Sequence, residues 1–215
     1  MTPQARPDAT PRTPAEAWQR LREGNARFVA GESLHPNQDA SRRQSLAGRQ
    51  DPFAVIFGCS DSRLAAEIIF DLGLGDAFVV RTAGQVIDDA VLGTVEYAVA
   101  NLSTPLIMVL GHDSCGAVTA AHAAAASGAM PRGFQRDLIE RIMPSVLETR
   151  RAGHDGVNAA VVEHTRQTAA RLLEQSRVIN DAVSRGDVAV VGVFYHLEDG
   201  QAELVHGHGT WLPSR

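Results

Sequence analysis

FAVIFGCSDSRLAAEII, residues 53–69, is the stretch of sequence that decides the fold. Its apolar start, residues 53–57, predicts a short buried strand, and a polar turn with Cys59, Asp61 and Arg63 follows. The stretch then continues as a helix with one apolar face. Because open α/β sheets build their sites at the carboxyl ends of strands, we expect a thiol, a carboxylate and a guanidinium at one end of a sheet.

PLIMVLGHDSCGAV, residues 105–118, repeats this arrangement about fifty residues later. Residues 106–110 predict another buried strand, His112 and Cys115 follow it, and a helix comes next. Cys115 lies at the predicted helix N-terminus, where the helix dipole favours a thiolate. The chain has only two cysteines, and each occupies the same place in a strand–turn–helix unit. This coincidence indicates a shared site.

The remaining pattern alternates strands and helices, which predicts an α/β fold with a mostly parallel β-sheet flanked by helices. A short turn at residues 198–200 predicts a hairpin and therefore an antiparallel edge strand. Further strands are expected at residues 77–80, 188–195 and 202–205, and further helices at 41–46, 88–102, 115–128, 137–151 and 158–184. Pro144 is expected to kink or restart the helix in which it lies.

The N-terminal region predicts a helical arm that precedes this sheet. TPAE at residues 13–16 is a capping box with proline at the first helical position. Trp18 and Phe28 then recur on a narrow apolar stripe that must cover either the chain's own sheet or a partner subunit. The predicted divisions are a disordered tail at residues 1–13, an N-terminal helical arm at 14–48 and an α/β zinc-binding catalytic core at 49–215.

Composition excludes several classes of function. The 25 acidic and 20 basic residues give a net charge of −5, and no basic stripe suggests a nucleic-acid partner. The longest apolar runs are far shorter than the ~18 residues that a membrane span needs. No secretory signal is recognisable at the N-terminus, where four prolines favour disorder. Two cysteines fit a reduced, cytoplasmic protein better than a disulfide-stabilised one.

Zinc is the metal that this set of side chains suits. Zn²⁺ prefers tetrahedral sites of nitrogen and sulfur, and a catalytic zinc keeps one position open beside three protein ligands. Asp61 would either take the fourth position or lean over a bound water, and Arg63 is placed to hold that carboxylate in a bidentate pair. A purely structural zinc with Asp61 as permanent ligand is the non-enzymatic alternative. Arg63 argues against it, because a ligated aspartate needs no guanidinium partner.

Each of these residues also has an ordinary interpretation. A single buried cysteine usually packs in a core, and a single histidine at a strand end is usually just hydrogen-bonded. Their joint occurrence at two strand ends is what favours a metal. The other histidines lack such a context: His206 and His208 are expected to be solvated, while His122, His154 and His164 fall on or beside helices.

At these residues the sequence closely resembles the β-class carbonic anhydrases. The family's Cys-x-Asp-x-Arg stands at residues 59–63 and its His-x-x-Cys-Gly at residues 112–116, within a resemblance that runs from about residue 18 to residue 200. The resemblance implies zinc-dependent reversible hydration of carbon dioxide to bicarbonate by attack of zinc-bound hydroxide. The implied zinc ligands are Cys59, His112 and Cys115, with Asp61 accepting the proton of the bound water and Arg63 orienting Asp61.

Family pocket residues are matched as well. Gln50, Phe78, Tyr97 and Gly116 stand at the corresponding positions. In the family this pocket lies at a dimer interface, so the resemblance implies a homodimer or homotetramer whose partner subunit supplies some of these side chains. A related zinc hydrolase of carbon disulfide or carbonyl sulfide is the alternative activity, because the same site could attack those linear molecules.

The resemblance also bears on regulation. In bicarbonate-regulated members, bicarbonate beside a tryptophan, an arginine and a tyrosine favours a closed site. Arg81 and Tyr195 match two of these positions, but Ile56 stands in the tryptophan's place. An isoleucine offers no N–H donor to the anion, so we expect bicarbonate not to be a strong allosteric inhibitor of this protein.

Overall fold

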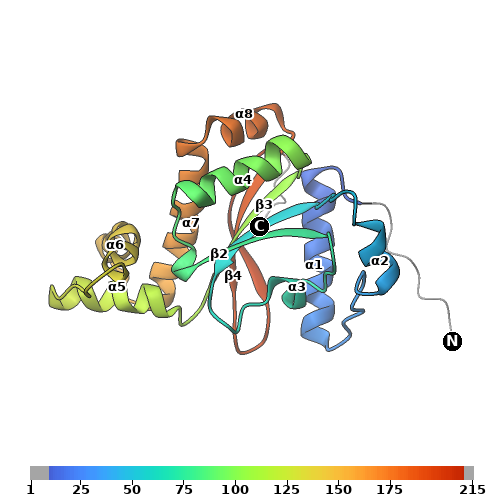
Figure 1. Cartoon of the computed structure of the whole chain (residues 1–215). Coiled ribbons are helices and arrows are strands. Elements are labelled where there is room, and N and C mark those ends of the chain that lie inside the picture. Colours follow the sequence, from blue (N-terminus) through green and yellow to red (C-terminus); the bar gives the residue numbers. More distant parts are fainter. Residues whose placement is uncertain (1–9, 211–215) are drawn as a thin grey trace.

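A five-stranded sheet forms the centre of the computed structural model, which describes residues 10–210 (Figure 1). The strand order is β2-β1-β3-β4-β5, with only β5 antiparallel to its neighbour. The strands are β1 (Ala54–Cys59), β2 (Ala77–Thr82), β3 (Leu106–His112), β4 (Ala189–Tyr195) and β5 (Ala202–His208). The predicted mostly parallel sheet with an antiparallel edge strand is therefore confirmed.

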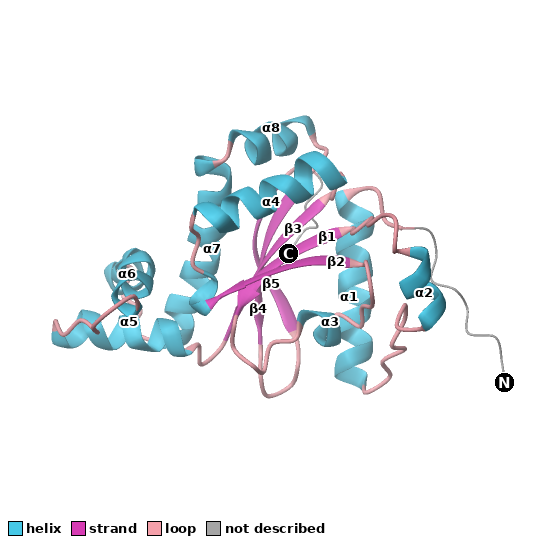
Figure 2. Cartoon of the chain, viewed as in Figure 1, coloured by secondary structure: helices cyan, strands magenta, loops and turns pink. Residues whose placement is uncertain are grey.

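Helices cover both faces of the sheet, as Figure 2 shows. They are α1 (Pro14–Ala30), α2 (Ala40–Ser45), α3 (Ala66–Ile69), the 3₁₀ turn η1 (Ala83–Gln85), α4 (Asp89–Leu102), α5 (Gly116–Ser127), α6 (Gln135–Arg151), α7 (Val157–Gln175) and α8 (Arg177–Arg185). In β1, Ile56 packs into the core shared with α1 and α3, while Val55 and Phe57 pack into the core shared with α4 and α8. Because both faces of the central strands are covered, these strands are buried along their whole length and apolar up to their carboxyl ends.

One prediction about helices was wrong. The helix expected at residues 158–184 is interrupted at Ser176, whose backbone is extended and whose hydroxyl caps α8 by accepting from the N–H of Ile179. A serine can satisfy a helix N-terminus in this way, and the break lets α8 pack beside α4. α6 runs through Pro144 without restarting, and the alternative expectation of a kink there stays a prediction. α5 and α6 extend from the body on the left of Figure 1.

The strands that carry the candidate ligands are longer than predicted. β1 continues to Cys59 and β3 to His112, so both side chains belong to the rigid sheet rather than to the turns that follow it. The helix expected after Arg63 is correspondingly short, because α3 covers only four residues.

α1 packs on the chain's own sheet. The predicted capping box is present: Thr13 Oγ1 accepts from the N–H of Glu16, and a Glu16 carboxylate oxygen accepts from the N–H of Thr13. Trp18 is buried in the core beside α3, and Phe28 packs at its border. The predicted tail lies mostly outside the described residues, although Arg12 donates to Asp51 at 2.8 Å. The proposed division into arm and core stays a prediction.

No described helix has the length and apolar character that a bilayer crossing requires.

Asn25 links α1 to two distant segments. Its buried amide donates to the carbonyls of Ile69, at 3.2 Å, and Gly200, at 2.8 Å. Its amide oxygen accepts from the N–H of Ala202, at 3.0 Å. One side chain thus satisfies three backbone groups next to α3 and at the start of β5.

We expect Asn25→Ala to lower the free energy of unfolding by about 2–3 kcal/mol, because it leaves buried backbone groups without partners. Urea denaturation followed by circular dichroism would measure the change. Gln19→Ala, on the exposed side of the same helix, is the control and should change the value by less than about 0.5 kcal/mol. Equal effects of the two substitutions would contradict the role assigned to Asn25.

Candidate metal centre

The site lies where the chain switches direction across the sheet. β1 pairs with β2 on one side and with β3 on the other. The chain leaves β1 toward β2 and leaves β3 toward β4, which lie on opposite sides of the β1–β3 pair. The carboxyl ends of β1 and β3 therefore border an open crevice, the usual place for a site in such sheets.

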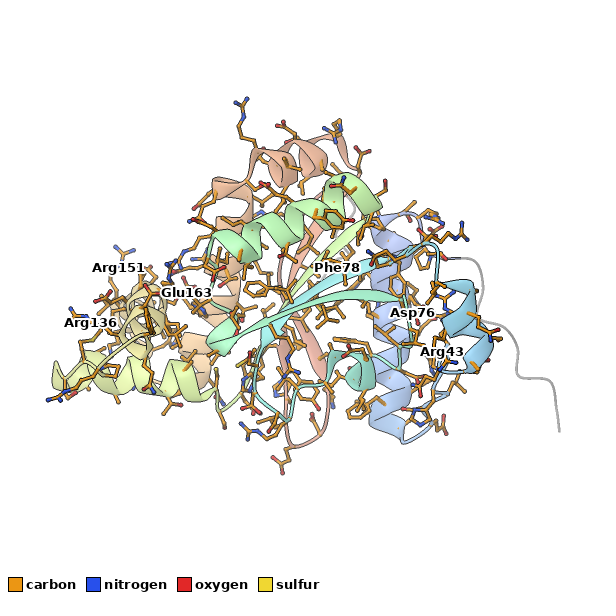
Figure 3. All side chains as sticks on the ribbon, in the orientation of Figure 1. Arg43, Asp76, Phe78, Arg136, Arg151 and Glu163 are labelled. Atoms are coloured by element: carbon orange, nitrogen blue, oxygen red, sulfur yellow. The ribbon has the colours of Figure 1, made fainter. Side chains whose placement is uncertain are left out.

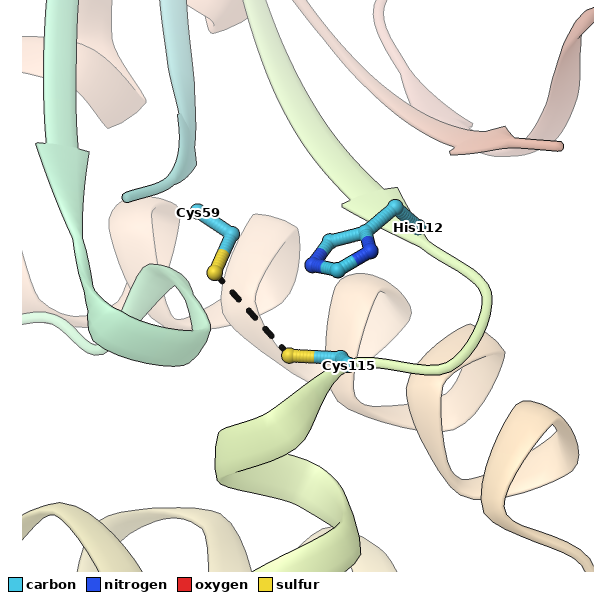
Figure 4. Close-up of side chains that lie close together, drawn as sticks. All are labelled: Cys59, His112 and Cys115. Carbon is cyan, nitrogen blue, oxygen red and sulfur yellow. Dashed lines mark hydrogen bonds between the residues drawn. The ribbon is translucent and has the colours of Figure 1, made fainter. Parts of the chain in front are cut away.

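Three potential ligands converge at this crevice (Figure 4). Cys59 ends β1, His112 ends β3 and Cys115 is the residue before α5. All three are buried, and their ligand atoms lie within 4.8 Å of one another. The two sulfurs are 4.0 Å apart and form no disulfide. Two 2.3 Å zinc–sulfur bonds at a tetrahedral angle would separate the sulfurs by about 3.8 Å, so the spacing fits zinc.

The imidazole of His112 supplies a direct test of whether a metal fits. Its Nδ1 lies 2.8 Å from the carbonyl oxygen of Asp113. A carbonyl only accepts, so Nδ1 carries the proton and Nε2 presents a lone pair. Nε2 is buried and has no hydrogen-bond partner among residues 10–210. An unsatisfied buried nitrogen is costly, and a cation between this nitrogen and the two thiols would satisfy it.

The two cysteines share one proton. Their mutual hydrogen bond is the main reason that the pKa of the Cys59 thiol falls to about 4. The same hydrogen bond, together with burial, raises the pKa of the Cys115 thiol. The N–H of Gly84 also donates to Cys59 Sγ, at 3.2 Å. A metal ion would take the place of the shared proton and leave both sulfurs as thiolates.

Asp61 and Arg63 form a bidentate pair at the rim of this cluster. Arg63 donates from Nε to Asp61 Oδ1 at 2.9 Å and from Nη2 to Oδ2 at 2.7 Å. This guanidinium holds the pKa of Asp61 well below its usual range, so the side chain stays a carboxylate. Oδ2 lies 4.0 Å from His112 Nε2. Asp61 thus stands beside the three potential ligands and is paired with Arg63 rather than with one of them.

Arg81 holds the turn that carries Asp61. Its guanidinium donates to the carbonyl oxygens of Cys59, at 2.9 Å, and Asp61, at 2.6 Å. A cavity of about 10 Å³ lies beside it, lined in part by Ile56 and Val79. That volume holds one water molecule at most. Tyr195, the other residue matched to bicarbonate regulation, does not line this cavity.

Three of the four predicted pocket residues, Gln50, Phe78 and Tyr97, are not brought to the cluster within one chain. Phe78 and Tyr97 face each other with ring centroids 6.2 Å apart, and Figure 3 shows Phe78 near the middle of the molecule. Phe78 pairs with Val55 in the sheet register, four residues or roughly 13 Å from the end of β1. Gln50 is exposed before β1. Gly116 directly follows Cys115 and opens α5.

The structure corrects one expectation about the histidines and shows that another histidine is buried. His206 and His208 were expected to be solvated, but both are half-buried and their Nε2 atoms lie 2.9 Å apart. His164 is buried on α7, and its Nε2 lies 2.8 Å from the carbonyl oxygen of Gly84. In the sequence, only the position of His164 on a predicted helix could have indicated that this side chain is buried. No sequence motif marked Gly84, so its contacts with both His164 and Cys59 could not be predicted.

Two thiols and an imidazole that could hold a metal ion, next to an ion-paired carboxylate at the carboxyl end of parallel strands, are the features of a candidate catalytic metal centre in an α/β protein.

Comparison with known proteins identifies the family. The sequence model of the carbonic anhydrases matches residues 54–202. The chain is 56% identical over 191 residues to the carbonic anhydrase of Mycolicibacterium smegmatis, covering 89% of this chain and 93% of that protein. It is also 56% identical to carbonic anhydrase 2 of Mycobacterium tuberculosis, with 89% and 92% covered. A tetrameric β-carbonic anhydrase from Sordaria macrospora shares the fold, with a TM-score of 0.71 at 21% identity, covering 89% of this chain and 98% of that chain.

The chain therefore belongs to the β-class carbonic anhydrase family, whose members are zinc enzymes that hydrate carbon dioxide. The comparisons favour this activity over the hydrolysis of carbon disulfide or carbonyl sulfide.

We expect Cys59→Ala and Cys115→Ala to lose zinc and activity together, because each leaves only two protein ligands. Zinc measured by mass spectrometry on the purified protein should fall from about one ion per chain to less than about a tenth of that. His122→Ala is the control, since His122 lies on α5 but pairs with Asp155 outside the cluster. Near-stoichiometric zinc in Cys59→Ala would show that the ligand set is wrong.

Proposed function

We propose that Cys59, His112 and Cys115 hold Zn²⁺, and that Asp61 and Arg63 serve the reversible hydration of carbon dioxide to bicarbonate at this ion. The observation that carries the assignment is the unpartnered Nε2 of His112, which faces two thiols. A zinc ion bound by three protein ligands acts as a Lewis acid that makes water a nucleophile near neutral pH.

Asp61 acts by orienting the attacking water. Each carboxylate oxygen has room for about two hydrogen-bond donors. Arg63 occupies one place on Oδ2, which leaves another for a water proton. Because Arg63 lowers the pKa of Asp61, this carboxylate accepts a hydrogen bond and does not store the proton. The proton released by the reaction must therefore leave to solvent buffers.

Arg63 has the complementary role of keeping Asp61 away from the metal. A carboxylate held by two guanidinium hydrogen bonds is fixed in orientation as well as in charge. If Asp61 moved onto the ion, it would have to break both bonds and would close the open position. We infer that the Asp61–Arg63 pair preserves a site in which water can bind.

A second copy of the chain completes the substrate pocket in this proposal. Phe78 and Tyr97 lie away from their own chain's cluster, and Tyr97 is 47% exposed although it is large and aromatic. We propose that these side chains, with Gln50, line the pocket of a neighbouring subunit, opposite that subunit's Gly116, in a homodimer or homotetramer. The Sordaria macrospora protein is described as tetrameric. Two free thiols also support a cytoplasmic location.

Asp61→Asn should keep its zinc and lose at least about a hundredfold in kcat/KM. The amide has one acceptor oxygen, so it cannot take both Arg63 hydrogen bonds and also accept from water. Arg63→Ala should act in the same direction by releasing Asp61. Stopped-flow hydration of carbon dioxide, with zinc measured on the same samples, tests both.

The matched control for this substitution is Asp155→Asn, which changes an exposed ion pair with His122 and should leave the rate unchanged. Loss of zinc from Asp61→Asn would instead make Asp61 a structural ligand and would contradict the proposed role.

Bicarbonate should not inhibit this enzyme cooperatively. The cavity beside Arg81 is too small for the anion, the guanidinium of Arg81 already binds two carbonyls, and Ile56 donates no hydrogen bond. The test is to titrate the hydration activity of wild type and of Ile56→Trp with bicarbonate at fixed alkaline pH. Steep cooperative inhibition of the wild type would overturn the expectation.

A further inference from the structure

A buried chain of hydrogen bonds leads from Cys59 into the interior, away from Asp61 and Arg63. The N–H of Gly84 donates to Cys59 Sγ at 3.2 Å. The carbonyl oxygen of Gly84 lies 2.8 Å from His164 Nε2. Gly84 is therefore held from both sides, by a sulfur of the metal centre and by an imidazole of α7.

The backbone at Gly84 needs such support. Gly84 has a φ of 66° and the next residue, Gln85, has a φ of 41°, so two consecutive residues adopt the left-handed conformation. That conformation is unfavourable for glutamine and persists only when neighbouring groups fix it. A Cβ atom at Gly84 would lie 2.9 Å from both Ala117 Cβ and Ile142 Cδ1. Only glycine brings this N–H to the sulfur.

His164 is fixed in one orientation. Because a carbonyl oxygen only accepts, Nε2 must carry the proton that it donates to Gly84. Nδ1 lies 3.0 Å from the hydroxyl of Ser145 on α6. That hydroxyl also lies 2.9 Å from the amide oxygen of Gln167. Its single proton can therefore be donated either to Nδ1 of His164 or to this oxygen, but not to both at once. His164 is 1% exposed, and burial lowers its pKa to about 4. The imidazole is thus neutral near pH 7.

We propose that His164 is a positioning residue for the metal ligand Cys59. Through the Gly84 carbonyl, its Nε2–H fixes the turn whose N–H bonds to the sulfur. A hydrogen bond to a thiolate draws charge from it, so the bond should set both the direction of the Cys59 lone pair and the charge that reaches the metal. Such partners beyond the ligands commonly change metal affinity 10- to 100-fold. The inference rests on the proposed function, because it takes Cys59 to be a ligand.

Two substitutions at His164 separate the hydrogen bond from packing. Gln can place an amide N–H near the position of Nε2, whereas Leu fills similar space without a donor. We expect His164→Leu to weaken Zn²⁺ binding, measured by competition with a chelator, about 10- to 100-fold. His164→Gln should stay within about threefold of wild type. With Co²⁺ as probe, the thiolate-to-metal charge-transfer band should shift in the Leu variant and return toward wild type in the Gln variant.

The control is Thr168→Val, which alters another buried residue one turn further along α7. It should leave both the zinc affinity and the cobalt spectrum unchanged. If His164→Leu does not fold, Ser145→Ala decides the question. It keeps the ring but removes the hydroxyl beside Nδ1, and should weaken zinc binding at least about threefold.

Three results would overturn the proposal. One is a zinc affinity within twofold of wild type in both His164→Leu and Ser145→Ala. Another is an equal loss in Thr168→Val, which would make the effect one of packing alone. The third is wild-type protein that takes up no zinc, which would overturn the proposed function as well. Zinc binding by wild type with no effect of His164 would overturn this inference alone.

Discussion

The parallel pairing of β1 with β3 is the interaction on which the metal centre depends. It brings the ends of two strands that are about fifty residues apart in sequence next to each other, in the register Gly58 to Leu110. Both strands are buried on both faces by apolar cores, so their ends have little freedom to move. A thiol and an imidazole placed at these ends therefore meet in a fixed geometry, and the residue before α5 adds the second thiol.

Burying these ligands creates an electrostatic problem that the surrounding residues solve in different ways. Two thiols and a carboxylate lie within one crevice, where burial disfavours charge. The carboxylate of Asp61 is balanced by Arg63, and the sulfur of Cys59 receives the Gly84 N–H. Arg81 adds positive charge while binding only carbonyls. Asp61 and Cys59 thus each have a donor that is not itself a potential metal ligand, and these donors fix their positions without a metal.

Sequence analysis found the parts of the site that are encoded locally. Cys59, Asp61 and Arg63 lie within five residues, and strand pattern and turn place them together without knowledge of the tertiary structure. His164 could not be found in this way, because it meets Gly84 across 80 residues and only after α7 has docked on the sheet. The break at Ser176 was missed for a similar reason: a helical pattern continues through it, and the packing of α8 against α4 decides where the helix ends. The strand ends were underestimated because Gly58 and Gly111 suggest turns, whereas the close approach of α7 at Gly111 requires glycine within the strand.

The position of Gly84 connects the metal centre to the stability of the fold. η1 joins β2 to α4, and its glycine touches α5 and α6 through Ala117 and Ile142 while bonding to Cys59 and His164. In the proposed site, a metal on Cys59 would therefore stabilise a turn that the backbone disfavours, and the turn would in return hold the ligand. Because metal binding and folding then share the same contacts, loss of the metal should loosen η1 first, together with the helix contacts around it. The outer helices α5 and α6 thus contribute to the support of Cys59 through η1, although no α6 residue belongs to the potential metal-binding group within the described residues.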